Sequence, residues 1–240
     1  FGRRMFAPPK RLKSLSAEAK KDAYIVLSFI FGLVFTAHLY MGAKVHTGEL
    51  PGGPLPFSNG IASIFAGVVG DGGWDTFGTV FWWLHCLCLF SFMCFLPYSK
   101  HQHLIWVWPN MFFRSLHPRG RIKKMEIDEN AESFGVGKPE DFSWKQLLDG
   151  MTCVECGRCT EQCPAFNTGK KLDPRLMIHH LKSALNESKK PEDQRQQLLG
   201  GVVSHEELWD CTTCGACMEA CPLYIEHVPS IVDMRRYLSL

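Results

Sequence analysis

Eight cysteines in the second half of the chain repeat one spacing twice. The first set lies in CVECGRCTEQCP and the second in CTTCGACMEACP, so each reads C-x2-C-x2-C-x3-C-P. Three thiolates at three-residue intervals converge from one tight loop, and this run is typical of sites that bind a [4Fe-4S] cluster. The pattern predicts two clusters and therefore a path for single electrons. The expected ligands are Cys153, Cys156, Cys159, Cys163, Cys211, Cys214, Cys217 and Cys221.

The fourth cysteine of each set is expected to leave its own loop and to ligate the other cluster, as in proteins that hold two clusters of this kind. Gly157 and Gly215 lie inside the loops, where the backbone must approach inorganic sulfide closely. Pro164 and Pro222 turn the chain away after each fourth ligand. The expected ligand sets are Cys153, Cys156, Cys159 and Cys221 for cluster 1, and Cys211, Cys214, Cys217 and Cys163 for cluster 2.

Zinc and disulfides are the alternative uses of these cysteines. Structural zinc sites use pairs of C-x2-C thiolates, whereas each set here is a triplet followed by a fourth cysteine and a proline. Disulfides need an oxidising compartment, and the topology expected below places these thiols in the cytoplasm. The spacing therefore favours clusters over both alternatives.

The composition divides the chain into regions that face different solvents. The chain has 240 residues, enough for one large or two modest domains, and its formal net charge of +2 gives no indication of a nucleic-acid partner. Phe and Trp concentrate before residue 115, while charge and the motif cysteines concentrate after it. We expect a membrane domain over 1–115, a cytoplasmic connector over 116–145 and a cluster-binding domain over 146–240.

Two stretches without a charged residue, 23–43 and 76–98, are long enough to cross a bilayer as helices. The alternative is a buried helix of a soluble core, but such helices rarely run this long without a charge. The apolar stretch 61–70 is too short to span and is expected to be re-entrant or interfacial. Three cysteines in the second span lack ligand spacing and are expected to pack as small apolar groups: Cys86, Cys88 and Cys94.

Basic residues flank both spans on the same side. The loop 45–75 between the spans has no Lys or Arg. The positive-inside rule then places both ends in the cytoplasm, so we expect a multi-pass protein of a bacterial or archaeal cytoplasmic membrane. Aromatic residues after the second span suit an interfacial segment: Trp106, Trp108, Phe112 and Phe113. The flanking basic residues are Arg3, Arg4, Lys10, Arg11, Lys13, Lys20 and Lys21 before the first span, and Lys100, Arg114, Arg119, Arg121, Lys123 and Lys124 after the second.

Three histidines lie in or beside the spans, where ionisable side chains are expensive and usually functional. On one continuous helix His85 and His103 would face the same way, about 27 Å apart, as axial haem ligands do in dihaem cytochromes b. Pro97 is expected to kink that helix. His38 lies at a similar depth to His85, and the two could share one haem. The alternative for His38 is a hydrogen bond between helices, or a place on a quinone or proton path.

Helix signals dominate the region after the connector. Ser143 is expected to cap a short helix that leads into the first cysteine motif. Pro174 and Pro191 are each expected to start a helix between the motifs. Ser204, with Glu207 three residues later, predicts a capping box for a third. With little strand signal, we expect an all-α cluster domain.

Three stretches together resemble membrane-bound iron–sulfur oxidoreductases related to heterodisulfide reductase, a family that includes electron-transfer-flavoprotein:menaquinone oxidoreductases. They are TAHLYMGAK, WWLHCLCLFSFMCFLPYSKHQHL and ESFGVGKPEDFSWKQLLDGMTCVECGRCTEQCPA. The resemblance covers about 10–240. It implies a membrane domain like the nitrate reductase gamma subunit, with haem b held by a pair matching His85 and His103, and quinone as the partner in the membrane. It also implies earlier membrane helices and C-terminal CCG domains, so we expect this chain to be part of a longer protein or assembly.

The expected fold class is all-α: a transmembrane helical hairpin, part of a cytochrome b-like bundle, followed by an α-helical ferredoxin domain. The expected function is transfer of single electrons between a cytoplasmic donor and the quinone pool, through two [4Fe-4S] clusters and one or two haems b. The donor would be a flavoprotein, such as an electron-transfer flavoprotein, or a CCG-domain protein. No catalytic residue is assigned. One alternative is a quinol-driven heterodisulfide or substrate reductase with the opposite electron flow, and another is a scaffold or sensor with structural clusters.

Overall fold

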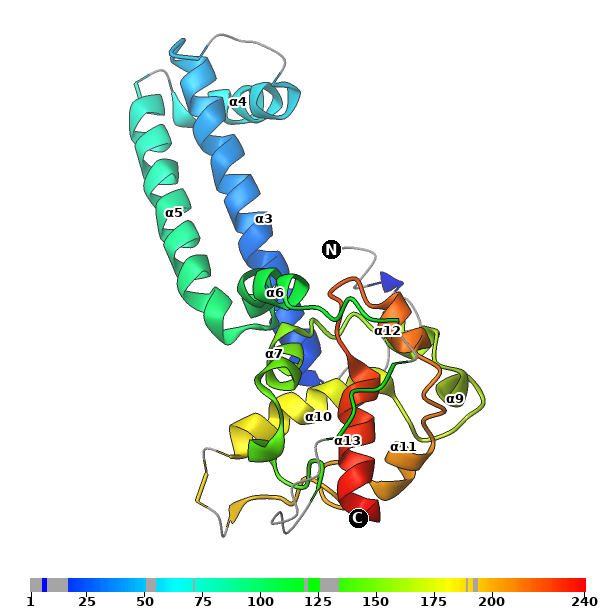
Figure 1. Cartoon of the computed structure of the whole chain (residues 1–240). Helices are drawn as coiled ribbons and strands as arrows, with labels where there is room; N and C mark the ends of the chain where they lie inside the picture. Colours follow the sequence, from blue (N-terminus) through cyan, green and yellow to red (C-terminus); the bar gives the residue numbers. More distant parts are fainter. Residues whose placement is uncertain are drawn as a thin grey trace. The chain divides into compact units, whose positions relative to one another are not determined.

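The computed structural model describes residues 6–7, 17–50, 55–70, 72–118, 121–125, 134–188, 190–191 and 194–240. These residues form helices, turns and loops, with one isolated bridge between Leu199 and Val203. The chain divides between Ser99 and Lys100 into two compact units (Figure 1). Apart from the N-terminal residues, unit 1 comprises Leu15–Ser99 and unit 2 comprises Lys100–Leu240. The all-α fold expected from the sequence is confirmed.

Unit 1 is built on two long helices, and a shorter third helix packs against the first of them. The helices are α3 (Ala17–His46), α4 (Pro56–Val69) and α5 (Trp74–Phe95). α3 and α5 lie side by side because small residues open the seam between them. A Cβ atom at Gly32 would lie 3.3 Å from Cys88 Sγ, and one at Gly78 would lie 3.2 Å from Ala43 Cβ. Cys88 fills this seam as a small side chain.

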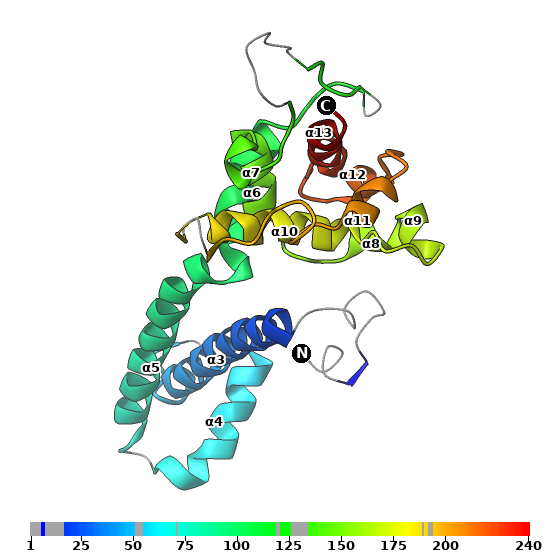
Figure 2. The same cartoon turned by 90° about the horizontal axis from the view of Figure 1, so that it is seen from below.

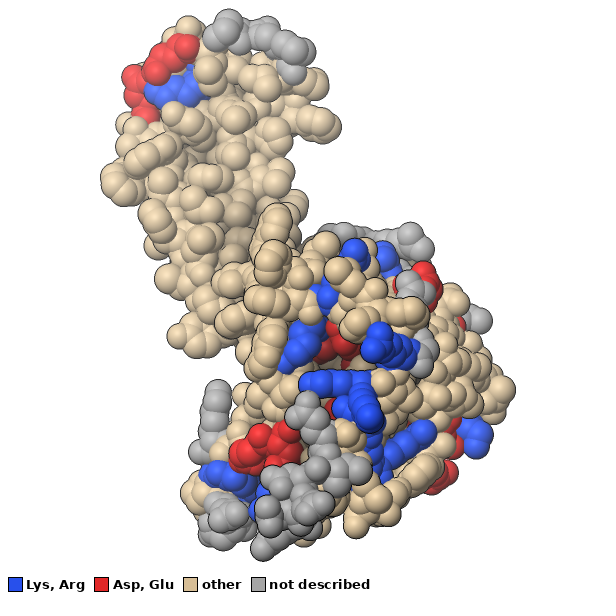
Figure 3. Space-filling model, in the orientation of Figure 1, with Lys and Arg blue, Asp and Glu red and all other residues tan. Residues whose placement is uncertain are grey.

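Two helices of unit 1 are long and apolar enough to cross a membrane, over Ala19–His46 and Trp74–Tyr98. Their large apolar side chains point outwards: Phe31, Trp83 and Phe90 are 66%, 63% and 67% exposed. In the core of a soluble protein such side chains would be covered. The visible face of unit 1 carries charge only at its end (Figure 3). α4 has 14 residues and matches the apolar stretch that was expected to be too short to span.

The helix of the second span does not continue from His85 to His103. After α5 ends, Ser99 adopts an extended conformation with φ −97° and ψ 169°, and Pro97 just before it cannot donate a backbone hydrogen bond. The expectation that both histidines stack on one helix is therefore wrong, because they belong to different helices. The elements that follow α5 are the 3-10 turns η1 (Leu96–Tyr98) and η2 (Lys100–Gln102), and then α6 (His103–Phe112).

Unit 2 contains short helices whose starts follow the capping residues read from the sequence. Ser143 and Ser204 form capping boxes with Gln146 and Glu207, and Pro174 is the first residue of a longer helix. All three helix starts are confirmed. After α6, the elements are η3 (Pro139–Asp141), α7 (Trp144–Thr152), α8 (Arg158–Glu161), α9 (Pro164–Asn167), α10 (Pro174–Glu187), α11 (His205–Trp209), α12 (Ala216–Ala220) and α13 (His227–Ser239).

The helix expected from Pro191 is absent from the described residues 194–200. A tight loop takes its place, in which Gly200 N–H donates to Val203 O and Val203 N–H donates to Leu198 O, both at 2.8 Å. Leu198 and Val203 are both buried in the core of unit 2. Burial of these two side chains outweighs the local helix propensity.

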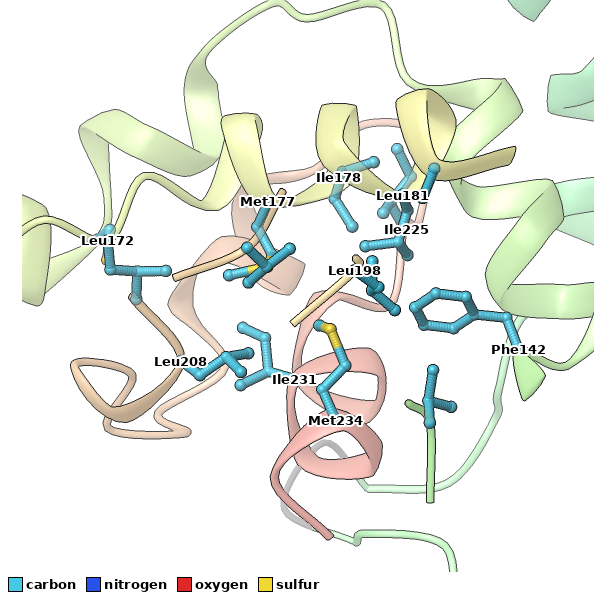
Figure 4. Close-up of a cluster of buried hydrophobic side chains, with 14 of the residues drawn as sticks. Phe142, Leu172, Met177, Ile178, Leu181, Leu198, Leu208, Ile225, Ile231 and Met234 are labelled. Atoms are coloured by element: carbon cyan, nitrogen blue, oxygen red, sulfur yellow. The ribbon is translucent and has the colours of Figure 1, made fainter. Parts of the chain in front are cut away.

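The larger of the two buried hydrophobic clusters in the described part of unit 2 packs against the cysteine loops (Figure 4). α10 contributes one apolar face and α13 another. Cys153, Cys211 and Cys221 pack against this cluster, so the core positions both motifs. The labelled core residues are Phe142, Leu172, Met177, Ile178, Leu181, Leu198, Leu208, Ile225, Ile231 and Met234.

Candidate metal centre

Two small cavities in unit 2 are each lined by four cysteines. In both cavities three thiols come from one motif and the fourth comes from the other motif. All eight cysteines are free thiols. The first cavity is lined by Cys153, Cys156, Cys159 and Cys221, and the second by Cys163, Cys211, Cys214 and Cys217.

The two cysteine loops have the same backbone conformation. Gly157 and Gly215 adopt left-handed angles, with φ 77° and 75°, and each precedes the short helix that carries the third cysteine. Two residues earlier Glu155 and Thr213 are left-handed as well, with φ 55° and 56°. Each non-glycine residue in this region costs about 1–2 kcal/mol. Both loops therefore contain the same strained positions, at the places where the backbone curves around each cavity.

Burial keeps several of these thiols protonated while no metal is bound. It raises the pKa of Cys159 and of Cys217 to about 12, and it raises the pKa of Cys153 further. Metal ligation requires the thiolate, so a bound metal must displace these protons.

A single metal ion and a cluster require different spacings of the four sulfurs. Within the described residues, which include all eight motif cysteines, no three Cys, His, Asp or Glu side chains are grouped closely enough to hold one metal ion. A tetrahedral zinc ion would hold its four sulfurs about 3.8 Å apart. A cubane cluster instead spreads four thiolates around a larger body.

Two buried basic side chains line the first cavity. Arg175 forms an ion pair with Asp173 at 3.0 Å, and Thr160 Oγ1 donates to the same carboxylate at 2.5 Å. His227 donates from Nδ1 to Ile225 O at 3.1 Å. Burial lowers the pKa of His227 to about 4, so it is neutral at pH 7. Neither residue could be assigned to the site from the sequence, because nothing in the local sequence around Arg175 or His227 indicates burial.

The backbone beside the second cavity is held by Arg235. Its guanidinium donates to Leu208 O and to Cys211 O, and it lies 5.0 Å from the centre of the Trp209 ring. Thr213 N–H points at Cys211 Sγ, 3.4 Å away. The loop before the second cavity is therefore fixed by a side chain of α13.

Sequence comparisons identify an iron–sulfur domain in the same part of the chain. Residues 145–222 match a family model described as a 4Fe-4S dicluster domain. The chain is 38% identical, over 91% of its length, to a probable iron-sulfur-binding oxidoreductase, FadF, of Bacillus subtilis. It is 35% identical, over 99% of its length, to an EtfAB:quinone oxidoreductase of Syntrophomonas wolfei. It is 38% identical, over 50% of its length, to a probable membrane-anchored ferredoxin of Chromohalobacter salexigens, of which it covers 21%.

The chain is related to these iron–sulfur oxidoreductases. The resemblance read from the sequence is thereby confirmed. The chain spans 36% of the Bacillus relative and 37% of the Syntrophomonas relative, little more than a third of each. No solved structure matches it.

In this iron–sulfur chain α6 is attached to the edge of the first cavity. Asn110 is fully buried and donates from Nδ2 to Leu223 O at 2.8 Å, and Thr152 Oγ1, whose proton goes to Leu148 O at 2.7 Å, lies 3.4 Å from Trp106 O. Thr152 directly precedes Cys153. The opposite face of α6 is apolar and open, with Trp108 77% exposed. The expected interfacial residues Phe112 and Phe113 are also exposed, and Trp106 is 37% exposed.

A polar network continues from α7 of this dicluster domain. Asp149 is fully buried, accepts from Lys145 Nζ at 2.7 Å and accepts from Glu226 N–H at 3.3 Å. Burial raises the pKa of Asp149 to about 6, against the lowering effect of Lys145.

The histidines of unit 1 have different neighbours. Thr36 Oγ1 donates its only proton to Gly32 O at 2.7 Å, so at 3.0 Å from His85 Nδ1 it accepts from that nitrogen. His85 Nε2 then keeps its lone pair. His38 Nδ1 lies 3.2 Å from Ser58 Oγ on α4. Thr36 and His38 are about 200° apart around α3, which favours the interhelical hydrogen bond for His38 over a haem shared with His85.

His103 stands at the start of α6, in unit 2. Its Nδ1 donates to Lys100 O at 3.0 Å, which leaves Nε2 as the nitrogen with a free lone pair. His85 and His103 thus present the same tautomer. A histidine that ligates a metal usually donates its other ring N–H in this way.

Proposed function

We propose that the chain carries single electrons between a cytoplasmic redox donor and the quinone pool, through two [4Fe-4S] clusters and haem b. One observation carries the proposal: each cysteine cavity is completed by the fourth cysteine of the other motif. This exchange holds two cluster sites in one small core. The bound clusters supply the one-electron chemistry, while the protein supplies position and shielding.

In this proposal the cysteines hold the clusters, and the surrounding backbone and buried side chains shield them from water. Cluster 1 would be held by the first cavity and cluster 2 by the second, as the motif spacing predicts. Backbone N–H groups of Glu155 and Thr213 point at ligand sulfurs, 3.4 Å away in each case. Hydrogen bonds to sulfur and exclusion of water are two of the ways in which a protein sets a cluster potential.

The proposal places α3 and α5 across a bacterial or archaeal cytoplasmic membrane. Their exposed aromatic and aliphatic side chains support it, as does the membrane anchor in the name of the Chromohalobacter relative. The Lys and Arg residues outside the spans support a cytoplasmic location for the cluster domain. The domain limits of 1–115, 116–145 and 146–240 remain part of the proposal.

Haem b is proposed on the strength of the histidine geometry. His85 and His103 each donate from Nδ1 and keep Nε2 free for iron. They lie on different helices, so each is proposed to ligate haem with a histidine from another part of the membrane domain. His38 stays a candidate ligand, second to its interhelical hydrogen bond.

Quinone and a flavoprotein are the proposed partners. The Syntrophomonas relative is named EtfAB:quinone oxidoreductase, which supports electron flow from an electron-transfer flavoprotein to quinone. The chain covers 37% of that relative. Parts that correspond to the rest of the relative would therefore complete the activity.

The test is a redox titration of the purified full-length protein or assembly that contains this chain. It would be prepared in detergent under anaerobic conditions, reduced with dithionite, and mixed with a water-soluble menaquinone analogue. We expect a broad iron–sulfur bleach with sharp b-type haem bands, both reversed by the quinone. Bound zinc without iron would contradict the proposal. If quinol drives the reduction of a disulfide through the clusters, and the reduced clusters do not reduce quinone, the proposed direction of electron flow would be wrong.

A further inference from the structure

The two cavities differ in how close their cysteines come to the surface. All eight motif cysteines are described, and Cys214 in the second cavity is the exposed one. Its neighbours Thr212 and Thr213 are exposed as well. The matching loop of the first cavity, over 153–156, is half-buried throughout. The second cavity is therefore the more accessible of the two.

The first cavity lies next to the apolar helix α6. Asn110 of α6 donates to Leu223 O, two residues after Cys221, and Trp106 O of α6 lies 3.4 Å from the hydroxyl of Thr152, which directly precedes Cys153. Figures 1 and 2 agree that α6 and α7 lie at one side of unit 2, with α9 and α11 at the other. α9 begins directly after Cys163, and α11 ends two residues before Cys211. The first cavity is therefore entered from the α7 side of the unit, and α9 and α11 border the second cavity on the other side.

The surface around Cys214 has the features of a protein-binding site. Trp209 is 56% exposed, and Arg235 lies against its ring. Trp and Arg are enriched among the residues that dominate binding energy at interfaces. Lys170 and Lys171 reach across to Asp210 and Glu206 at 3.1 Å and 2.5 Å, which gives this surface a rim of paired charges.

We propose that the cluster in the second cavity exchanges electrons with the flavoprotein partner, which docks over Trp209 and Cys214, and that the cluster in the first cavity is the one on the membrane side. The proposal rests on the function proposed above and specifies its order. One electron passes between the flavin of the partner and the cluster held by Cys211, Cys214, Cys217 and Cys163. That electron then moves between the two clusters, and no bond is made or broken.

The test measures how close each cluster comes to water in the intact chain. The EPR signals of the two reduced clusters would be assigned with Cys153→Ser and Cys211→Ser, which keep an oxygen ligand. A water-soluble dysprosium chelate would then be added to the wild-type chain in detergent. Because relaxation by this probe falls steeply with distance, we expect the half-saturation power of cluster 2 to rise at least threefold more than that of cluster 1.

Two substitutions at equivalent positions provide the control. Thr212 and Val154 each follow the first cysteine of their motif. Thr212→Trp should lower the dysprosium effect on cluster 2 at least twofold, while Val154→Trp should leave that effect unchanged. An equal or larger effect on cluster 1 in the wild type would overturn the inference alone. Absence of both cluster signals would contradict the proposed function instead.

Discussion

Glu155 and Thr213 have the same left-handed conformation in two separate loops, and each points its N–H at the cysteine two residues earlier, 3.4 Å away. Neither residue is a glycine. The two motifs are therefore one structural unit used twice, down to backbone angles that their amino-acid types disfavour. A strained conformation that recurs in this way indicates a constraint imposed by the cavity.

Substitution of the loop glycines should show how strict this constraint is. Gly157→Val and Gly215→Val each place a β-branched residue at positive φ, and we expect each to destabilise its loop by about 2 kcal/mol. Glu155→Gly relieves strain and should change stability by less than about 1 kcal/mol. Loss of iron–sulfur absorbance on heating at a fixed rate measures both. Equal losses for Gly157→Val and Glu155→Gly would count against the argument.

A comparison of Gly135 with Gly169 distinguishes steric crowding of a new side chain from strain in the backbone. Its φ is 82°, and a Cβ atom there would lie 2.3 Å from Asp233 O and 2.7 Å from Tyr237 N. Gly169 has the same φ with open space around it. We expect Gly169→Ala to cost about 1 kcal/mol from strain alone, and Gly135→Ala to cost about 2–4 kcal/mol. Thermal unfolding of the two variants compares them, and similar midpoints would refute the packing of 134–137 against α13.

Asn110 should matter more than other asparagines of unit 2. Asn110→Leu keeps the volume but leaves Leu223 O without its donor, at a cost of about 1–3 kcal/mol. Asn167 also donates to a carbonyl, Glu161 O at 3.0 Å, but on the surface, so Asn167→Leu should cost about 0.5 kcal/mol or less. Because Leu223 lines the first cavity, Asn110→Leu should also change the EPR signal of cluster 1 and spare cluster 2. Identical stability of the two variants would rule out the anchoring role of α6.

Thr36 is the test of the haem proposal. Thr36→Val removes the acceptor of the His85 N–H with little change in shape, and loss of such a partner typically lowers metal affinity about 10–100-fold. Thr79 on α5 donates only to Asp75 O in its own helix, so Thr79→Val is the matched control. Haem content per chain after detergent washing provides the measurement. Unchanged haem content in Thr36→Val, with loss in Thr79→Val, would contradict the proposal that His85 ligates haem.

Local signals in the sequence sufficed for the helix starts and for the grouping of residues into motifs. Ser143, Pro174 and Ser204 each use a cap that depends on neighbours within a few residues. The failed helix from Pro191 has the opposite cause, because Leu198 and Val203 are drawn into a core formed by distant segments. Local propensity does not contain that information.

The buried side chains beside the cavities could not be predicted from the sequence, because their positions also depend on segments that are distant in the chain. Arg175 and His227 become neighbours of the first cavity only when α10 and α13 pack together. The break after α5 separated His85 from His103 because Ser99 is extended. Helical spacing across a proline could not predict this.

Exchange of the fourth ligands is the central claim, and one EPR comparison tests it most directly. Full-length chains carrying Cys163→Ser, Cys211→Ser or Cys153→Ser would be reduced under anaerobic conditions, and iron would be quantified against about eight atoms per chain for two clusters. We predict that Cys163→Ser alters the same signal as Cys211→Ser and leaves the signal that Cys153→Ser alters. If Cys163→Ser instead alters the signal that Cys153→Ser alters, each motif keeps its own cluster and the claim is contradicted.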